Sequence, residues 1–173
     1  MYKEQFKVNN RIYKTIKLLG KGKSGYSFLV YDENNFKYCL KQIHHEPCDY
    51  YNFGDKLKAE INDYDVLKNF IPLPKLYDVD YENEIIVKEY IDGELVSDLI
   101  QNNKLDKSYM DIIIKYALIC KENGLNIDYY PTNFIISNNC MYYVDYECNE
   151  YMKEYDFDNW GRKYWIKNMN TCS

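Results

Sequence analysis

The first ninety residues alternate between short runs rich in aromatic and β-branched side chains and short clusters of glycine, asparagine, aspartate and proline. This alternation is typical of β-strands that end at tight turns. We expect strands over residues 12–19, 26–31, 36–43, 75–81 and 84–90. Between the third and fourth of these, apolar residues at spacings of three and four predict a helix that begins near Asp55 and ends before Pro72.

The pattern changes after residue 95. Apolar spacing predicts a helix over residues 107–123, for which Asp106 is a suitable N-terminal cap and Gly124 a suitable end. A short amphipathic stretch is expected over residues 95–100, two short strands over 133–137 and 140–145, and a last helix over 159–169. The chain is therefore expected to be an α+β protein.

Composition excludes several classes of protein. Hydrophobic residues make up 46% of the chain and charged residues 28%, which argues against disorder throughout. No apolar run approaches the roughly 18 residues that cross a bilayer, and no signal-peptide core is present, so we expect a cytoplasmic protein without a membrane span. The 6 cysteines include no C-x-x-C pair, which predicts free thiols rather than a zinc site or disulfides.

Positive charge is concentrated at the start of the chain. Residues 1–25 carry seven lysines or arginines against one glutamate, although the net charge of the chain is −5. This excess can attract an anion such as a nucleotide, or it can belong to a solvated strand face. Because the chain is acidic overall and lacks a nucleic-acid-reading motif, we expect no nucleic-acid partner.

A glycine-rich turn containing Gly20, Gly22 and Gly25 separates the first two expected strands. A dinucleotide fingerprint requires the third glycine to open a helix, so this position argues against that fold. In a strand–turn–strand unit, glycines let backbone N–H groups approach phosphate oxygens, but an ordinary hairpin has the same spacing. Both interpretations stay open on these residues alone.

Lys41 lies on the strand expected over residues 36–43, and Glu60 lies on the helix that follows. Separately, a strand lysine commonly aids solubility and a helix glutamate is commonly a solvated charge. Together they permit a second interpretation, in which the glutamate holds the lysine ammonium group so that it points at a polyphosphate.

Asp128, Asn133 and Asp145 follow the helix expected over residues 107–123. One carboxylate can orient a hydroxyl group and accept its proton, while the other carboxylate and the amide oxygen can bind Mg²⁺, which prefers oxygen ligands. Each residue is also an ordinary polar side chain for a loop or a strand end.

The order of these features resembles the signature set of the protein-kinase-like superfamily over residues 12–147. The resemblance implies a two-lobed α+β fold, with a five-stranded antiparallel N-lobe sheet carrying one helix and a reduced, mainly helical C-lobe. As a single domain over residues 1–173, the chain would have its N-lobe at 1–90, a hinge at 89–94 and its C-lobe at 95–173.

The resemblance also implies roles for the residues of the expected N-lobe. Gly20, Gly22 and Gly25 would cover the phosphates of ATP. Lys41, held by Glu60, would contact the α- and β-phosphates.

The remaining implied roles concern the hinge and the C-lobe. The backbone of Glu89 and Ile91 would bind adenine, and Asp128 would be the catalytic base. Asn133 and Asp145 would hold Mg²⁺.

The chain departs from the family pattern at several positions. Asn126 and Ile127 stand where the family has His-Arg, and Lys88 precedes the hinge where an apolar or small residue is usual. Residues 145–147 read Asp-Tyr-Glu, which is similar to aminoglycoside and choline kinases. The chain ends soon afterwards, so it resembles a minimal bacterial-type kinase with a truncated C-lobe.

The function implied by the resemblance is transfer of the γ-phosphoryl group of ATP to a hydroxyl group, with Mg²⁺ as cofactor. A serine/threonine protein kinase is the first expectation. A small-molecule kinase and a nucleotide-binding pseudokinase module are the alternatives. The expected partners are ATP, a protein or small-molecule hydroxyl acceptor and, for the pseudokinase alternative, a protein partner.

Overall fold

The computed structural model describes residues 3–47 and 54–166, and the chain divides into two compact units. Unit 1 comprises Met1–Ile61 and Pro74–Tyr90, and unit 2 comprises Asn62–Leu73 and Ile91–Ser173. Helix α1 (Lys56–Leu67) begins in unit 1 and ends in unit 2.

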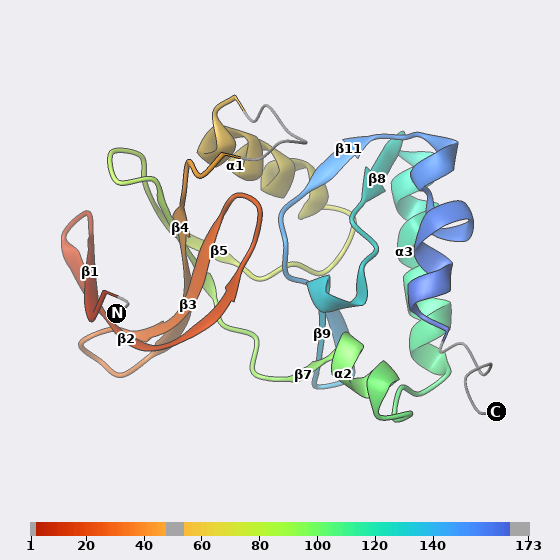
Figure 1. Ribbon diagram of the computed structural model, residues 1–173, viewed down its shortest axis with the longest axis horizontal. Helices are drawn as coiled ribbons and strands as arrows, with labels where there is room; N and C mark the ends of the chain where they lie inside the picture. The colour runs from red at the N-terminus through yellow and green to blue at the C-terminus, as the bar shows by residue number, and fades with distance from the viewer. Residues whose placement is uncertain (1–2, 48–53, 167–173) are drawn as a thin grey trace. The chain divides into compact units, whose positions relative to one another are not determined.

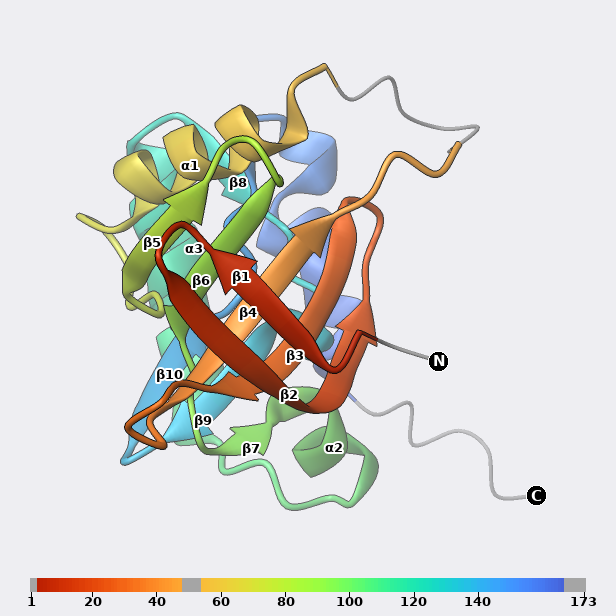
Figure 2. The ribbon, with the colours of Figure 1, turned by 90° about the vertical axis from the view of Figure 1, so that its left-hand side faces the viewer.

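Unit 1 is built on an antiparallel sheet that has six strands among the described residues, in the order β1-β2-β3-β4-β6-β5 (Figure 2). The strands are β1 (Gln5–Val8), β2 (Arg11–Lys21), β3 (Gly25–Tyr31), β4 (Lys37–Ile43), β5 (Leu76–Asp80) and β6 (Ile85–Glu89). Asn9 and Asn35, in the turns before β2 and β4, have φ angles of 51° and 64°. Asparagine tolerates this left-handed conformation better than most residues, which explains the turns.

The sheet is strongly curled. Two register shifts between β2 and β3, at Thr15/Lys17 and Leu18/Gly20, bend β2. The turn after β1 consequently reaches β5, where the Asn9 side-chain amide donates to Asp78 Oδ1 at 2.8 Å. Figure 2 shows the β1–β2 hairpin in front of β4 and β6.

The two faces of the sheet bury different side chains. One face encloses a core of Phe6, Val8, Tyr13, Phe28, Val30, Leu40, Ile85 and Val87. The other face packs against Leu57 of α1 through Ile43 and Ile86. Because side chains alternate along a strand, Lys41 lies on the same face as Ile43 and points to the α1 side.

Unit 2 combines helices with short strands (Figure 1). Its strands form a three-stranded sheet, β10-β9-β7, and a two-stranded sheet, β11-β8. Its elements are β7 (Glu94–Leu95), α2 (Val96–Gln101), α3 (Ser108–Glu122), β8 (Leu125–Ile127), β9 (Phe134–Ser137), β10 (Cys140–Tyr143) and β11 (Cys148–Glu150). Asn138 and Asn139, with positive φ angles, make the tight turn between β9 and β10.

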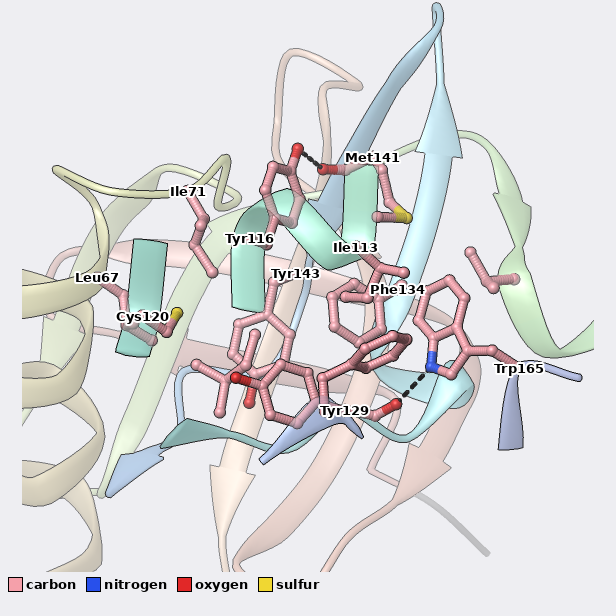
Figure 3. Packing of buried hydrophobic residues seen from close by; sticks show 13 residues of the cluster. Leu67, Ile71, Ile113, Tyr116, Cys120, Tyr129, Phe134, Met141, Tyr143 and Trp165 are labelled. Carbon is pink, nitrogen blue, oxygen red and sulfur yellow. Dashed lines mark hydrogen bonds between the residues drawn. The ribbon is translucent and has the colours of Figure 1, made fainter. Parts of the chain in front are cut away.

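Helix α3 and the end of the described chain enclose the core of unit 2 (Figure 3). The Tyr116 hydroxyl donates to the Met141 carbonyl at 2.9 Å, and Trp165 Nε1 donates to the Tyr129 carbonyl at 2.7 Å. Trp165 is 4% exposed, so the segment after residue 159 packs on the core. This core supports the backbone of the loop that contains Asp128.

These elements correct the expected fold. The sheet of unit 1 contains a strand, β1, that the sequence pattern did not indicate, so it is not the expected five-stranded sheet. Unit 2 is not mainly helical, because α2 and α3 are its only α-helices within residues 91–166 and short strands form two further sheets. The structure therefore does not show the expected two-lobed kinase arrangement with a helical C-lobe.

The helix predictions had mixed outcomes. The helices expected near Asp55 and over residues 107–123 are confirmed as α1 and α3. The last expected helix is wrong over its described part, which forms a π turn at Phe157–Gly161 and a 3₁₀ turn at Arg162–Tyr164. Residues 167–169 of that expected helix lie outside the described residues.

The described cysteines are free thiols, as the sequence predicted: Cys39, Cys120, Cys140 and Cys148. Cys48 and Cys172 lie outside the described residues. In the described part of the chain, no three histidine, cysteine or acidic side chains gather as a metal site would require. No helix in that part is long and apolar enough to span a membrane.

Candidate functional site

The glycine-rich turn joins β2 to β3, so its expected strand–turn–strand setting is confirmed. The Gly22 N–H donates to the Gly25 carbonyl at 2.9 Å, which closes the turn. A Cβ atom on Gly25 would lie 2.6 Å from the Gln42 carbonyl oxygen and 3.2 Å from Lys41 Cε. Gly25 is therefore required for the close approach of β3 to β4, and it places the turn beside the Lys41 side chain.

Lys41 and Glu60 form a buried ion pair in unit 1. Lys41 Nζ lies 2.6 Å from Glu60 Oε2, and both residues are 6% exposed. The second carboxylate oxygen, Glu60 Oε1, is buried without a hydrogen-bond partner in the described structure. The structure thus brings together the lysine and the glutamate that the sequence singled out.

A second lysine lies near this pair. Lys88 on β6 is directly opposite Cys39 on β4, and Cys39 lies on the same face as Lys41. Burial raises the pKa of the Cys39 thiol, while the positive charges of Lys88 and Lys41 partly oppose that rise. Lys88 is itself only 4% exposed. The side chains of Lys41 and Lys88 therefore both lie on the α1-facing side of the sheet.

The expected adenine-binding backbone is divided between the units. Glu89 ends β6 in unit 1, and Ile91 begins the second segment of unit 2. The Glu89 N–H donates to the Lys75 carbonyl at 2.8 Å, and a Glu89 carboxylate oxygen accepts from the Lys75 N–H at 3.1 Å. In this conformation the Glu89 N–H is hydrogen-bonded to Lys75 and is not available to a ligand.

In unit 2, the hydroxyl of buried Tyr143 links two segments of the candidate site. It accepts from the Asp128 N–H at 3.3 Å and donates to the Glu147 carbonyl at 2.9 Å. Burial raises the pKa of Tyr143 well above its ordinary value, and the charge of Asp145 adds to that rise. The hydroxyl consequently stays protonated and can donate to Glu147.

Asn133 is held between Asp128 and the end of β10. Its side-chain amide donates to the Asp128 carbonyl at 3.3 Å, and its backbone carbonyl accepts from the Val144 N–H at 2.8 Å. Val144 directly precedes Asp145. These two hydrogen bonds therefore place Asp128, Asn133 and Asp145 in one neighbourhood of unit 2.

The segment after Asp145 is anchored to helix α1 inside unit 2. Asp63 accepts from the Cys148 N–H at 3.2 Å and from the Cys148 thiol at 3.5 Å. The buried Tyr146 ring lies 4.8 Å from the Tyr64 ring. The sequence analysis did not identify Asp63, because a contact across 85 residues leaves no spacing pattern to detect.

Asn133 and Asp145 provide a set of oxygen donors compatible with Mg²⁺. This cation is commonly bound by one or two carboxylates together with waters and substrate phosphates. A site of that kind does not need the larger cluster of acidic side chains that is absent from the described residues. Because the Asn133 amide nitrogen points at the Asp128 carbonyl, its amide oxygen faces away from that carbonyl.

Comparison with known proteins gives partial matches. No protein-family model matches the chain. The "Probable bifunctional tRNA threonylcarbamoyladenosine biosynthesis protein" of Methanocaldococcus jannaschii is 34% identical over 84 residues, which cover 47% of this chain and 15% of that protein. The protein with the same name from Methanococcus vannielii is 33% identical over 89 residues, which cover 50% and 16%. This chain is similar to part of each. It matches about a sixth of the length of these curated relatives.

These relatives overturn the expected function. Both are named for the biosynthesis of a modified nucleoside in tRNA, and neither is named for phosphorylation of a protein or a small molecule. The expectation of a serine/threonine protein kinase is therefore wrong, and the small-molecule kinase and pseudokinase alternatives are withdrawn with it.

Proposed function

We propose that this chain is an ATP-using module of an enzyme that forms threonylcarbamoyladenosine in tRNA. The proposed use of ATP rests on the buried ion pair between Lys41 and Glu60, which lies beside the glycine-rich turn. A lysine is an effective partner for phosphate when a carboxylate fixes the direction of its ammonium group. The tRNA part is supported by the names of the partial relatives.

In this proposal, unit 1 binds the phosphates of ATP. Lys41 supplies a positive charge to the α- and β-phosphates, and Glu60 keeps that charge in place. The glycine-rich turn supplies backbone N–H groups, which can approach phosphate oxygens closely because Gly20 and Gly22 carry no side chain. For Gly20, the space beside the backbone is open to 4 Å in the described structure.

In unit 2, Asn133 and Asp145 would hold Mg²⁺ through their side-chain oxygens. Mg²⁺ supplies positive charge of the kind that offsets negative charge on phosphate oxygens. The hydrogen bonds from Val144 to Asn133 and from Asn133 to Asp128 keep these groups in a defined arrangement before any ligand binds.

The proposed use of ATP is its hydrolysis, in which Asp128 orients the water molecule that attacks the γ-phosphorus. Its Oδ1 accepts from the Tyr130 N–H at 3.1 Å, which fixes the rotation of the carboxylate and directs Oδ2 elsewhere. When a water oxygen bonds to the γ-phosphorus of ATP, the bond from that phosphorus to the β,γ-bridging oxygen breaks and ADP leaves. Asp128 would accept one proton of that water, and inorganic phosphate is the second product.

The proposal is tested by measuring nucleotide binding and phosphate release on the purified chain. ATP should raise the melting temperature, and Mg²⁺ should increase that shift. Lys41→Ala should abolish the shift. Asp145→Ala should abolish only the additional shift due to Mg²⁺, and Asp128→Asn should bind ATP yet release phosphate much more slowly.

Lys37→Ala is the matched control, because Lys37 is an exposed lysine on the same strand as Lys41. It should behave as the wild type. Absence of any ATP-induced shift in the wild type would remove the proposal.

The tRNA part has a separate test. Unmodified tRNA should change the rate of phosphate release in the wild type, and an unstructured RNA of equal length should not. Identical rates with and without tRNA would contradict the proposed role in tRNA modification while leaving ATP use intact.

A further inference from the structure

His44, a residue to which the sequence analysis assigned no role, holds the glycine-rich turn. Its Nε2 lies 3.0 Å from the Gly22 carbonyl oxygen, and its backbone N–H donates to the Ser24 carbonyl at 2.9 Å. A carbonyl oxygen can only accept, so Nε2 carries the proton. His44 Nδ1 accepts the Glu46 N–H at 3.3 Å, which agrees with this single neutral tautomer.

The His44 ring is held on the side of the sheet opposite Lys41. His44 follows Lys41 by three residues, and its N–H to Ser24 bond continues the β3–β4 ladder, so the alternation of side chains puts the two on opposite faces. The His44 ring lies 5.2 Å from Tyr26, whose ring is 6.5 Å from Phe28 in the core of that opposite face.

Further contacts keep His44 and the turn in place. The buried Lys56 ammonium group donates to the His44 carbonyl at 2.7 Å. Glu46 binds both the Lys21 ammonium group and the Tyr26 hydroxyl at 2.5 Å. His44 and Glu46, which immediately follow β4, therefore hold the turn through contacts on the side of the sheet away from Lys41.

The contact with His44 sets the direction of one peptide group. The contact with His44 therefore holds the Gly22 carbonyl oxygen toward the side of the sheet opposite Lys41. Lys41 Cε is already close to this turn, at 3.2 Å from the position of a Cβ atom on Gly25.

We propose that His44 is a positioning residue, which keeps the Gly22 carbonyl oxygen turned away from the phosphate groups that Lys41 binds. This inference rests on the proposed use of ATP. A flipped peptide group would present the Gly22 carbonyl oxygen to those phosphates instead, and two oxygens of negative character would repel each other.

The test compares three variants of the full chain. His44→Ala removes the donor, whereas His44→Gln keeps an amide nitrogen at the distance of Nε2 from the backbone. His45→Ala is the matched control, because the neighbouring His45 contacts Glu84 at 2.6 Å and does not contact the turn. Affinities for ATP and for adenosine are measured by calorimetric titration.

We expect His44→Ala to weaken ATP binding about tenfold, because the Gly22 carbonyl oxygen can then turn toward the phosphates and repel them. Adenosine, which has no phosphate, should bind as it does to the wild type. His44→Gln should restore most of the ATP affinity, and His45→Ala should leave both affinities unchanged. A merely structural role would weaken ATP and adenosine binding together.

A second measurement needs no ligand. Trypsin cleaves after lysine, and Lys21 and Lys23 flank Gly22. Cleavage at these two sites should be faster in His44→Ala than in the wild type and in His44→Gln.

The inference is overturned if His44→Ala binds ATP as tightly as the wild type, if it loses ATP and adenosine equally, or if cleavage of the turn is unchanged. Wild-type protein that binds neither ligand would instead overturn the proposed use of ATP, and the role of His44 with it.

Discussion

Lys41 Nζ and Glu60 Oε2 are 2.6 Å apart, and each side chain has less than a tenth of its surface exposed. Glu60→Ala takes away a carboxylate that lies against a poorly solvated ammonium group. We expect Glu60→Ala to lower the free energy of unfolding by about 3–5 kcal/mol, measured by urea denaturation.

The double variant Lys41→Met/Glu60→Leu should recover much of that loss, because apolar side chains of similar size need no counter-charge. The control is Asp65→Ala. Asp65 forms an exposed pair with Lys68 on helix α1, and its loss should cost less than about 1 kcal/mol. Equal losses for Glu60→Ala and Asp65→Ala would show that the buried pair is solvated in solution.

Two glycines of the same turn should differ in their tolerance of a methyl group. Gly25→Ala places a Cβ atom 2.6 Å from the Gln42 carbonyl oxygen, so β3 and β4 must separate. Gly20→Ala meets no atom within 4 Å in the described structure. We expect a loss of about 1–3 kcal/mol for Gly25→Ala and little change for Gly20→Ala, measured by thermal and urea unfolding.

Both variants keep φ angles that alanine can adopt, since neither glycine has a positive φ. A similar loss of stability at both positions would therefore contradict the close approach of β3 to β4.

Local sequence patterns predicted the elements that depend on local spacing. The helices α1 and α3, the glycine-rich turn, and the two short strands expected over residues 133–137 and 140–145 all appear in the structure. The sequence analysis did not identify strand β1, which has four residues and pairs with β2. The tail was mispredicted because Asp156 accepts from the Asn159 N–H and starts a π turn rather than a regular helix.

The candidate site was predictable where chain order was informative. Lys41 and Glu60 were paired from their places on a strand and the next helix, and the structure brings them together. His44 and Asp63 were missed, since their partners Gly22 and Cys148 lie 22 and 85 residues away. The function was mispredicted because groups suited to a nucleotide do not by themselves identify a reaction.

The Cys148 thiol should be slow to react with alkylating reagents. Burial and the negative charge of Asp63 raise its pKa to about 12, so at pH 8 only about one thiol in ten thousand is ionised. Asp63→Asn removes the charge that disfavours the thiolate, so the pKa should fall and alkylation should become faster. Peptide mapping after timed iodoacetamide treatment, over a series of pH values, measures this change.

Cys140 is the internal control, because it is also a half-buried free thiol but lies on β10. Its alkylation should be the same in the wild type and in Asp63→Asn. Faster labelling of both thiols would point to general loosening of unit 2 rather than to the hydrogen bond from Cys148 to Asp63.

Trp165 should stabilise unit 2 through its indole nitrogen as well as its ring. Its Nε1 is the donor to the Tyr129 carbonyl at 2.7 Å, and both residues are buried. Trp165→Phe keeps an aromatic ring in the core but leaves that carbonyl without this donor, so we expect a loss of about 1–3 kcal/mol in urea unfolding. Trp160→Phe, which alters a partly buried ring against Tyr164, should cost less. Tyr129 directly follows Asp128, so Trp165→Phe should also slow phosphate release more than it weakens ATP binding. An equal effect on phosphate release and on ATP binding would mean that the indole only maintains the fold.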